Sequence, residues 1–329
     1  MPPRTRTKPA ARPARARGPA PPEAARPAGP HALPAEFDPA IYAAGDDPAL
    51  AGLDPAQLRA HYDRLGREAG RRASAIGGRR DFLALLPADG PVLEIGPFCT
   101  PASLPGRAAP VRYLDILPTE ALRATTAGFE WADPDKVPEI DYVWHGEPYR
   151  ALIGERFDAV LSSHCIEHQP CLITHLTDLA SVLRPGGRVF LVVPDKRYCF
   201  DHFLPASSLA DVLEAYAERR TRIAPRAVLA ARLMITHNDP VQHWRGAHGE
   251  GPWQRSAGAD LAERINTALR EARAGAPAFD VHAWQFVPAS FRHLIGTLAA
   301  TGLSPLRLER LYPTLRDSNE FHAVLRVAA

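Results

Sequence analysis

The sequence lacks the features that mark membrane-spanning and disulfide-linked proteins. None of its apolar runs approaches the ~20 residues that a membrane-spanning helix needs. It contains four cysteines in 329 residues, and no two of them form a CxxC pair. Because so few and so irregularly spaced cysteines fit reduced thiols, we expect a cytoplasmic protein without stable membrane insertion.

Charge is unevenly distributed along the chain, whose formal net charge is +2. Residues 1–30 contain seven Lys and Arg against one Glu, which leaves the rest of the chain with a net charge of −4. A mildly acidic body lacks the basic surface of nucleic-acid-binding proteins, so we expect no nucleic-acid partner. The Pro/Ala/Arg-rich residues 1–35 are predicted to be a disordered tail, and contact with a polyanion or an acidic membrane is the alternative. They lack the apolar core of a secretory signal.

A small helical module is predicted over residues 36–80. Apolar residues between Phe37 and Leu65 recur three or four positions apart, as on one face of a helix. Asp54-Pro55 has the pattern of a helix N-cap followed by proline at the first helical position. Glycines punctuate the far end of the module.

From residue 81 to 195, short apolar runs alternate with helical stretches, which is typical of a parallel sheet with helical crossovers. The predicted strands are 91–95, 111–116, 141–144, 157–162 and 188–193, and the predicted helices are 119–126, 171–183 and a short turn at 148–153. The strands are apolar nearly throughout, as expected for strands that are buried on both faces. We therefore predict a doubly wound α/β domain.

The remaining chain divides into a polar, histidine-bearing insertion, 196–285, and a C-terminal segment, 286–329. The insertion is predicted to form a helical cap over the substrate, with helices near 207–221, 225–235 and 258–274. The C-terminal segment is predicted to hold a helix at 288–301 and two strands, 304–312 and 320–327, that complete the sheet.

An acidic residue and a glycine end the first predicted strand, in Glu94-Ile95-Gly96-Pro97. Glycine at the carboxyl end of a strand lets the backbone approach a ligand closely, although a structural turn explains such a glycine equally well. No GxGxxG follows, which disfavours a nicotinamide dinucleotide. The prolines of this loop leave little room for the helix N-terminus that a diphosphate would need, so S-adenosylmethionine, which has no phosphate, suits it better.

The ends of the next two strands supply further candidate residues. Asp115 ends the second strand, where a carboxylate can accept hydrogen bonds from both hydroxyls of a ribose. The alternative role of Asp115 is to cap the helix that begins at Thr119. Trp144 ends the third strand and could stack on adenine or pack in the core.

The pattern over residues 91–195 resembles class I S-adenosylmethionine-dependent methyltransferases, in the methyltransferase-11-like group. The resemblance is carried, in order, by LEIGP at 93–97, YLD at 113–115, FDAVLSSHCIEH at 157–168 and LRPGGRVFLVVPD at 183–195. It implies a Rossmann-like sheet of seven strands, mostly parallel with an antiparallel last strand, and S-adenosylmethionine as cofactor. The residues expected to bind the cofactor are Glu94, Gly96, Pro97, Asp115, Ile116, Trp144, Ser163 and His164. Pro97 and Phe98 stand where further glycines are common in such proteins.

Two further segments, VPDKRYCFDHF at 193–203 and FDVHAWQFVPASF at 279–291, look like a bacterial subgroup associated with cell-surface polysaccharide or glycosyl-transfer systems. Residues 37–71 resemble a helical module found on such proteins. The similarity implies a saccharide-related or other small-molecule acceptor, methylated on oxygen or nitrogen, and a partner from a glycosyltransferase system.

Methyl transfer to an alcohol or amine needs a side chain that removes the acceptor's proton. Candidates after the fourth and fifth strands are His164, Glu167, His168, Asp195, Lys196, Asp201 and His202. We predict His168 first and His202 second as catalytic residues, although a surface or structural role is the commoner one for any single histidine. The clusters His237-Asn238-Asp239 and His243-Trp244-Arg245 would line a cap suited to a sugar.

Residues 164–168 also read HxxEH, which on a helix would present two imidazoles and a carboxylate to zinc, as in zinc hydrolases. Because Gln169-Pro170 follows, and the residue before a proline avoids helical geometry, we expect a strand-to-loop edge here and no metal site. Two other functions stay open: a nicotinamide-dependent oxidoreductase, and a non-catalytic S-adenosylmethionine-binding or scaffold protein of a glycosylation system.

Overall fold

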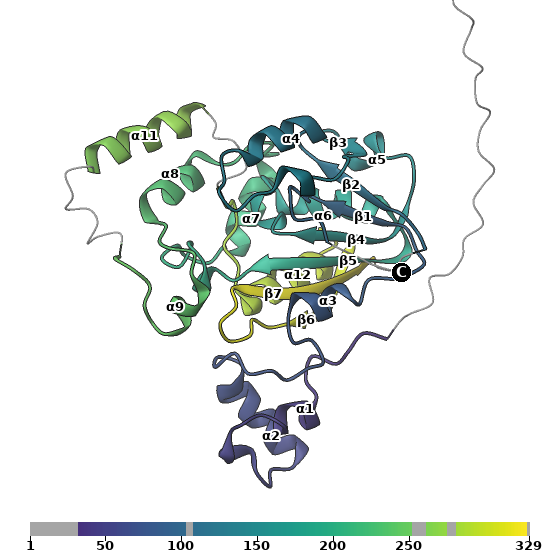
Figure 1. Cartoon of the computed structure of the whole chain (residues 1–329), viewed down its shortest axis with the longest axis vertical. Coiled ribbons are helices and arrows are strands. Elements are labelled where there is room, and N and C mark those ends of the chain that lie inside the picture. The colour runs from purple at the N-terminus through teal and green to yellow at the C-terminus, as the bar shows by residue number, and fades with distance from the viewer. Residues whose placement is uncertain (1–31, 103–107, 252–260, 275–280, 328–329) are drawn as a thin grey trace, which may run out of the picture.

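The computed structural model describes residues 32–102, 108–251, 261–274 and 281–327. Its centre is a seven-stranded sheet of order β3-β2-β1-β4-β5-β7-β6 (Figure 1). The strands are β1 Val92–Ile95, β2 Val111–Asp115, β3 Tyr142–Val143, β4 Phe157–Ser163, β5 Leu183–Pro194, β6 Leu306–Tyr312 and β7 Glu320–Val327. Strands β1 to β5 pair in parallel, and β7 runs antiparallel between β5 and β6. The predicted Rossmann-like fold is confirmed.

Helices pack on both faces of the sheet and extend beyond it. They are α1 Pro39–Ala43, α2 Pro55–His61, α3 Arg79–Leu83, α4 Thr119–Thr126, α5 Tyr149–Leu152, α6 Leu172–Ser181, α7 Leu209–Ala217, α8 Pro225–Met234, α9 Pro240–Trp244, α11 Leu261–Ala274 and α12 Pro288–Ala300. The shorter helical turns are η1 Pro48–Leu50, η2 Tyr62–Gly66, η3 Pro134–Lys136, η4 Ile166–His168 and η5 Lys196–Tyr198. None of the described helices is long and apolar enough to span a bilayer.

Burial on both faces explains the continuous apolar runs of the strands. Val189, Leu191 and Val193 of β5 belong to the large core that α6 and α12 cover. The alternate residues Phe190 and Val192 belong to a second core on the opposite face, with α3. Successive side chains of a strand point to opposite faces, so both faces of β5 must be apolar.

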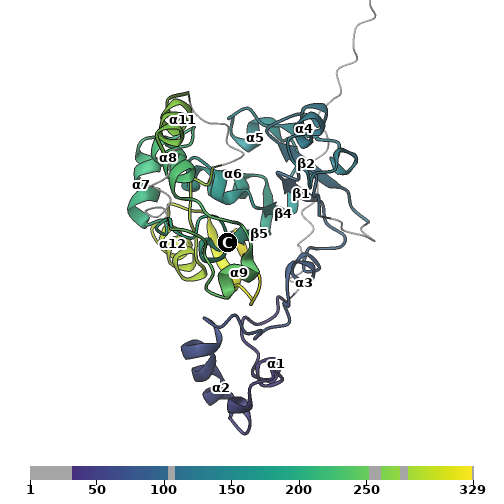
Figure 2. The ribbon, with the colours of Figure 1, turned by 60° about the vertical axis from the view of Figure 1, so that its left-hand side comes forward.

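The N-terminal helices enclose a small core of their own, made by Tyr42, Leu50, Leu58, Tyr62 and Ala73. Asp54 caps α2 with a full capping box, at the position that the sequence indicated. Figures 1 and 2 show these helices at one end of the molecule, beyond α3. Helix α3 falls at the end of the predicted module, but it packs on the sheet instead.

The insertion between β5 and α12 lies beside the carboxyl ends of the parallel strands, as both ribbon views show. Helices α7, α8, α9 and α11 belong to it, and Ile223, Val228, Ala231 and Val281 form a small core within it. Residues 258–260 of the helix predicted at 258–274 lie outside the described residues. This arrangement puts the insertion at the edge of the sheet where α/β proteins bind ligands.

Strand β5 begins five residues earlier than the sequence predicted. Leu183 pairs with Phe157, and Arg188 then pairs with Ala159, so the register shifts between the two pairs. The Pro-Gly-Gly segment lies inside this irregularity, with Gly186 at φ 75°. The turn residues therefore interrupt a strand, and the preceding helix α6 ends at Ser181 rather than at the predicted residue 183.

Candidate functional site

Neighbouring strands deliver Gly96 and Asp115 to one edge of the sheet. Strands β1 and β2 are parallel, with Ile95 opposite Leu114, and the Gly96 amide donates to the Leu114 carbonyl at 2.9 Å. Gly96 and Asp115 each follow this matched pair of residues. The backbones of Gly96 and Asp115 therefore lie side by side at the carboxyl ends of the strands.

Two features of the structure explain why position 96 is a glycine. Its φ is 65°, a left-handed conformation that other residues adopt at a cost. A Cβ on Gly96 would lie 2.3 Å from the Cys165 sulfur. That thiol comes from the loop after β4 and donates to the Ile95 carbonyl at 3.2 Å. Close approach of the two loops therefore requires glycine here.

Asp115 is buried, with 6% of its surface exposed. Burial raises the pKa of its carboxyl group, and hydrogen bonds from backbone amides, that of Ile116 among them, oppose the rise. The Ile116 amide donates to Asp115 Oδ1 at 2.7 Å. No Lys or Arg within the described ranges forms an ion pair with Asp115. The carboxylate thus keeps capacity to accept hydrogen bonds from a ligand.

Glu94 holds the loop that follows β1. Its two carboxylate oxygens accept from the Ala102 amide at 2.9 and 3.1 Å. Burial raises the pKa of Glu94 to about 7, against the hydrogen bond from Ala102 and the charge of Arg79. Pro97 is buried in the same loop. Glu94 therefore supports the backbone of the predicted cofactor loop.

Trp144 follows β3, and its amide donates to the Asp115 carbonyl at 2.8 Å. Its indole N–H donates to the Glu147 carbonyl at 2.6 Å, and its ring meets Tyr149 edge to face with centroids 5.8 Å apart. Trp144 is partly buried against the main core. The core-packing role that the sequence left open is present, next to Asp115.

Ser163, which ends β4, and His164, which follows it, contact α3 and β7. Arg79 Nη2 donates to Ser163 Oγ at 2.9 Å and to Glu320 Oε1 at 2.8 Å. His164 Nε2 lies 2.8 Å from Glu320 Oε1, and His164 has a φ of 51°. Burial would raise the pKa of Glu320, but the hydrogen bond and charge of His164 and the charge of Arg79 outweigh it and lower that pKa to about 2. These residues join three elements at the sheet edge.

The HxxEH segment does not form an α-helix, which agrees with the prediction made from Pro170. Its residues Ile166–His168 form one 3-10 turn, η4. Its Glu167 is completely buried. His168 Nδ1 lies 3.0 Å from the Val281 carbonyl, and the His168 ring meets the His282 ring edge to face, with centroids 4.7 Å apart.

His282 is a functional candidate that sequence reasoning missed. Its Nδ1 lies 2.7 Å from Asp201 Oδ2, and both side chains are buried. Burial lowers the pKa of His282, but the hydrogen bond with Asp201 and the charges of Asp201 and Glu167 raise it above the usual value overall. The available signal was the 279–291 segment, which the sequence marked through resemblance alone.

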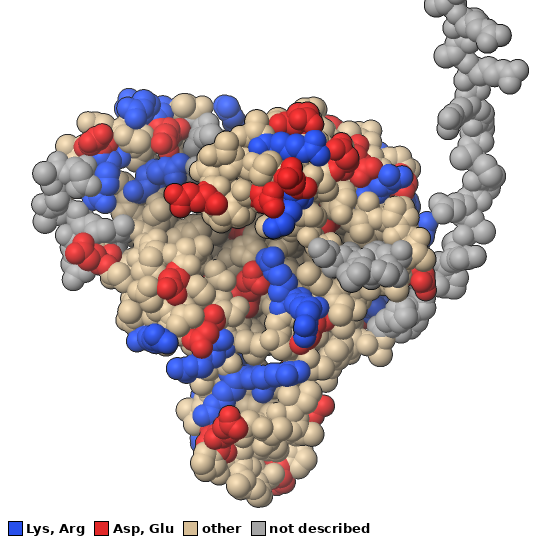
Figure 3. All heavy atoms as spheres, in the orientation of Figure 1, with Lys and Arg blue, Asp and Glu red and all other residues tan. Residues whose placement is uncertain are grey.

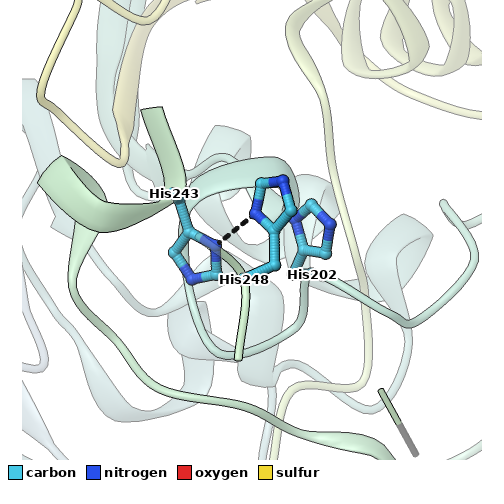
Figure 4. A group of neighbouring side chains, drawn as sticks. All are labelled: His202, His243 and His248. Atoms are coloured by element: carbon cyan, nitrogen blue, oxygen red, sulfur yellow. Dashed lines mark hydrogen bonds between the residues drawn. The ribbon is translucent and has the colours of Figure 1, made fainter. Parts of the chain in front are cut away.

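The predicted catalytic residue His202 lies in a different cluster, with His243 and His248 (Figure 4). His202 Nδ1 is 2.7 Å from the Arg197 carbonyl, and its ring stacks on His248 with centroids 3.7 Å apart. His243 Nδ1 and His248 Nδ1 are 3.0 Å apart and share a hydrogen bond. The structure therefore separates His202 from the cluster of His168 and His282.

Two other candidates from the sequence have structural contacts. Asp195 is completely buried and accepts from Arg197 Nη2 and from Thr314 Oγ1, each at 2.7 Å. Lys196 Nζ donates to the His202 carbonyl at 2.8 Å. Asp195 and Lys196 thus fix the start of the insertion.

The face in Figure 3 is hollowed between the sheet and the helical insertion. Acidic and basic side chains are interspersed over the part of this face that the structure describes. The hollow lies where Figure 1 places the carboxyl ends of β4 and β5. A ligand that enters it would meet the sheet edge.

A sheet of order 3-2-1-4-5-7-6, with one antiparallel strand and a Gly–Asp pair at its carboxyl edge, defines a Rossmann-like methyltransferase fold. The model of the methyltransferase domain family matches residues 67–257. That match covers more than half of the chain, and the chain belongs to this family of S-adenosylmethionine-dependent methyltransferases. S-adenosylmethionine is the cofactor of this family.

Similar solved structures have low sequence identity to the chain. The methyltransferase CalH in complex with S-adenosylhomocysteine is 14% identical, with a TM-score of 0.34, over 72% of this chain and 51% of that one. The carbon methyltransferase CurJ is 14% identical, with a TM-score of 0.36, over 76% and 52%. A putative zinc-dependent alcohol dehydrogenase from Rhodobacter sphaeroides is 16% identical, with a TM-score of 0.40, over 82% and 94%. No curated protein matches the chain.

Proposed function

We propose that this protein transfers the methyl group of S-adenosylmethionine to an oxygen or nitrogen atom of a saccharide-related or other small-molecule acceptor. The observation that carries the proposal is that the parallel strands β1 and β2 bring Gly96 and Asp115 to the same edge of the sheet. The sulfonium supplies an electrophilic methyl group when the cofactor is bound. The protein must then hold the donor, align the acceptor and exclude water.

The residues at the edge fit the chemistry of the donor. The Asp115 carboxylate can accept hydrogen bonds from ribose hydroxyls, and such bonds to a charged acceptor are strong. The half-buried backbone at Gly96 suits the methionine part, because no side chain projects from it. Glu94 contributes indirectly, since it fixes the loop between Pro97 and Ala102.

The acceptor would enter between the insertion and the carboxyl ends of β4 and β5, with residues 196–285 as its cap. His168 remains our first candidate for the side chain that removes the acceptor's proton, with His202 second. We add His282, because a buried carboxylate orients its ring: Asp201 Oδ2 lies 2.7 Å from Nδ1. Sequence features alone support three further parts of the proposal: a saccharide-related acceptor, a partner from a glycosyltransferase system and a cytoplasmic location.

The direct test is binding of S-adenosylmethionine to an Asp115→Ala variant, measured by calorimetry. Loss of a charged hydrogen-bond acceptor costs about 1.5–3 kcal/mol, so we expect an affinity lower by roughly 10- to 100-fold. Asp158→Ala is the matched control. Asp158 lies near the start of β4, where Arg184 Nη1 donates to it at 3.2 Å.

The control should bind S-adenosylmethionine as the wild type does. An unchanged affinity in Asp115→Ala would remove this residue from the donor site. Binding of a nicotinamide dinucleotide instead would favour the oxidoreductase alternative.

A further inference from the structure

The Glu167 carboxylate is buried without a hydrogen-bond partner. Its residue has 0% exposure, and neither oxygen has a partner within the described part of the chain. A buried polar group left in this state is costly, and a buried charge more so. A positive group is therefore expected close to it.

Three imidazole nitrogens surround one oxygen of this carboxylate, beyond hydrogen-bond distance. Glu167 Oε1 lies 3.6 Å from His164 Nδ1, 3.9 Å from His168 Nε2 and 3.9 Å from His282 Nε2. These separations leave room for an atom between the carboxylate and the rings.

The outer hydrogen bonds of two rings determine which nitrogen faces Glu167 with a lone pair. His282 Nδ1 lies 2.7 Å from Asp201 Oδ2, and His168 Nδ1 lies 3.0 Å from the Val281 carbonyl. A carboxylate and a carbonyl only accept, so each Nδ1 carries the proton. In the neutral rings both Nε2 atoms then present lone pairs. Metal-binding histidines have this arrangement, with the outer N–H donated to a carboxylate or carbonyl.

We propose that Glu167, His168 and His282 bind a divalent transition-metal ion. Two imidazole nitrogens and one carboxylate oxygen suit Zn²⁺, Co²⁺, Mn²⁺ or Fe²⁺. Their three ligand atoms lie within 4.8 Å of one another. Bonds of about 2.1 Å to a tetrahedral ion would put ligand atoms about 3.4 Å apart, so closing on the ion needs small side-chain movements.

The backbone holds the two contributing segments together. The amides of Ala283 and Trp284 both donate to the Glu167 carbonyl, at 2.7 and 3.0 Å. These two hydrogen bonds hold residues 281–284 against η4. The HxxEH segment therefore supplies two of the three proposed metal ligands, Glu167 and His168, from a 3-10 turn. The third ligand is His282, whereas in a helical HxxEH motif it would be His164.

The second histidine cluster does not have the geometry of a metal site. The rings of His202 and His248 are nearly parallel, 12° apart in orientation, and stacked at 3.7 Å. A bound metal ion lies near the plane of each imidazole ligand, and two stacked parallel planes cannot share one ion. His248 is therefore the matched control position for the test.

Three protein ligands leave coordination positions open, which is typical of catalytic rather than structural metal sites. An acceptor oxygen would occupy such a position and ionise more readily there. With the metal bound, His168 and His282 would act as its ligands and the ion would take over the role of the base. This last step rests on the proposed function, whereas the metal site does not.

The test is metal binding by the full-length chain without an affinity tag, after removal of metals with a chelator. Titration with Co²⁺ should saturate at one equivalent, with visible absorption bands of a bound Co²⁺ ion. We expect His282→Ala and Glu167→Gln to lower the Co²⁺ affinity at least 100-fold. Asp201→Asn, which leaves the three ligands in place, should lower it by about 10- to 100-fold. His248→Ala should bind as the wild type does.

Absence of saturable Co²⁺ binding in the wild type would overturn the proposal. So would binding that survives His282→Ala and Asp201→Asn, or that is lost in His248→Ala. Binding of S-adenosylmethionine, measured on the same samples, reports whether each variant is folded. Donor binding without Co²⁺ binding would refute the metal site and leave the proposed function intact.

Discussion

Single residues at the sheet edge meet two requirements at once. Gly96 must adopt a φ of 65° and must also leave room for the Cys165 sulfur. Gly52 has a similar φ of 75°, but a Cβ there would meet nothing within 4 Å. A substitution at Gly52 therefore has only the conformational cost of a positive φ, whereas one at Gly96 has this cost and a steric clash as well.

We predict that Gly96→Ala lowers the free energy of unfolding by more than Gly52→Ala. A non-glycine residue in the left-handed region costs about 1–2 kcal/mol, and this cost applies to both variants. The contact with Cys165 adds a further penalty at position 96, because overpacking typically costs about 1–3 kcal/mol. Urea denaturation of both variants measures the difference. Equal losses would mean that the contact with Cys165 has no energetic weight.

For single residues, the sequence predicted the place in the fold better than it predicted the side chains in contact with them. Gly96 and Asp115 could be placed at one edge because both end apolar runs, and parallel strands end on the same side. The partner of Gly96, Cys165, lies in another loop and could not be found from local pattern. The same holds for His164, whose acceptor Glu320 is 156 residues away.

Elements are joined at the sheet edge by a small charged network. Arg79 begins α3, Ser163 ends β4 and Glu320 begins β7, and Arg79 donates to both of the others. The network holds β7 to the end of β4 through side chains, beyond the pairing of β5 with β7. Its strength should depend on the ionisation of Glu320.

We predict that Glu320→Gln destabilises the protein in a pH-dependent way. The pKa of Glu320 is about 2 in the folded protein, below its ordinary value of 4.5. Its contribution to stability is therefore fully present above about pH 4.5 and is lost as the pH falls toward 2. The variant should be less stable by about 2 kcal/mol at pH 7, and the deficit should shrink between pH 5 and pH 3.

Chemical denaturation across this pH range measures the deficit. The exposed Glu120→Gln on α4 is the control, with an expected change below about 0.5 kcal/mol. A deficit that stays constant from pH 7 to pH 3 would show that the charge of Glu320 does not stabilise the network.

Element boundaries followed local signals wherever the signal was strong. Helices α2, α8 and α12 begin at Pro55, Pro225 and Pro288, because proline suits the first helical position. Strand β5 departs from its local signal. The pairing of Leu183 with Phe157 extends it across a Pro-Gly-Gly segment that by itself predicts a turn.

At the scale of the whole molecule, the alternation of strands and helices predicted the sheet, and the family resemblance predicted its seven strands with the last one antiparallel. The convergence of Glu167, Asp201 and His282 was not predictable. His282 and Asp201 are 81 residues apart, and no periodicity links them. The insertion brings them together by folding back on the carboxyl edge of the sheet.

The position of the insertion indicates which part of the molecule would bind the methyl donor and which would bind the acceptor. Strands β1 and β2 would supply the donor edge, and the insertion lies beside the edge at β4 and β5. The loop that contains Cys165 lies between them, since its thiol donates to Ile95 and its next turn carries Glu167. Donor and acceptor would thus meet beside the Cys165 loop.

The most direct test of this account is a crystal structure of the protein with S-adenosylhomocysteine bound. We predict that an Asp115 carboxylate oxygen lies within hydrogen-bond distance of a ribose hydroxyl, with the amino-acid part of the ligand against Gly96. The empty methyl position should face the cluster of His168 and His282. A ligand bound elsewhere, or one whose ribose does not contact Asp115, would contradict the account.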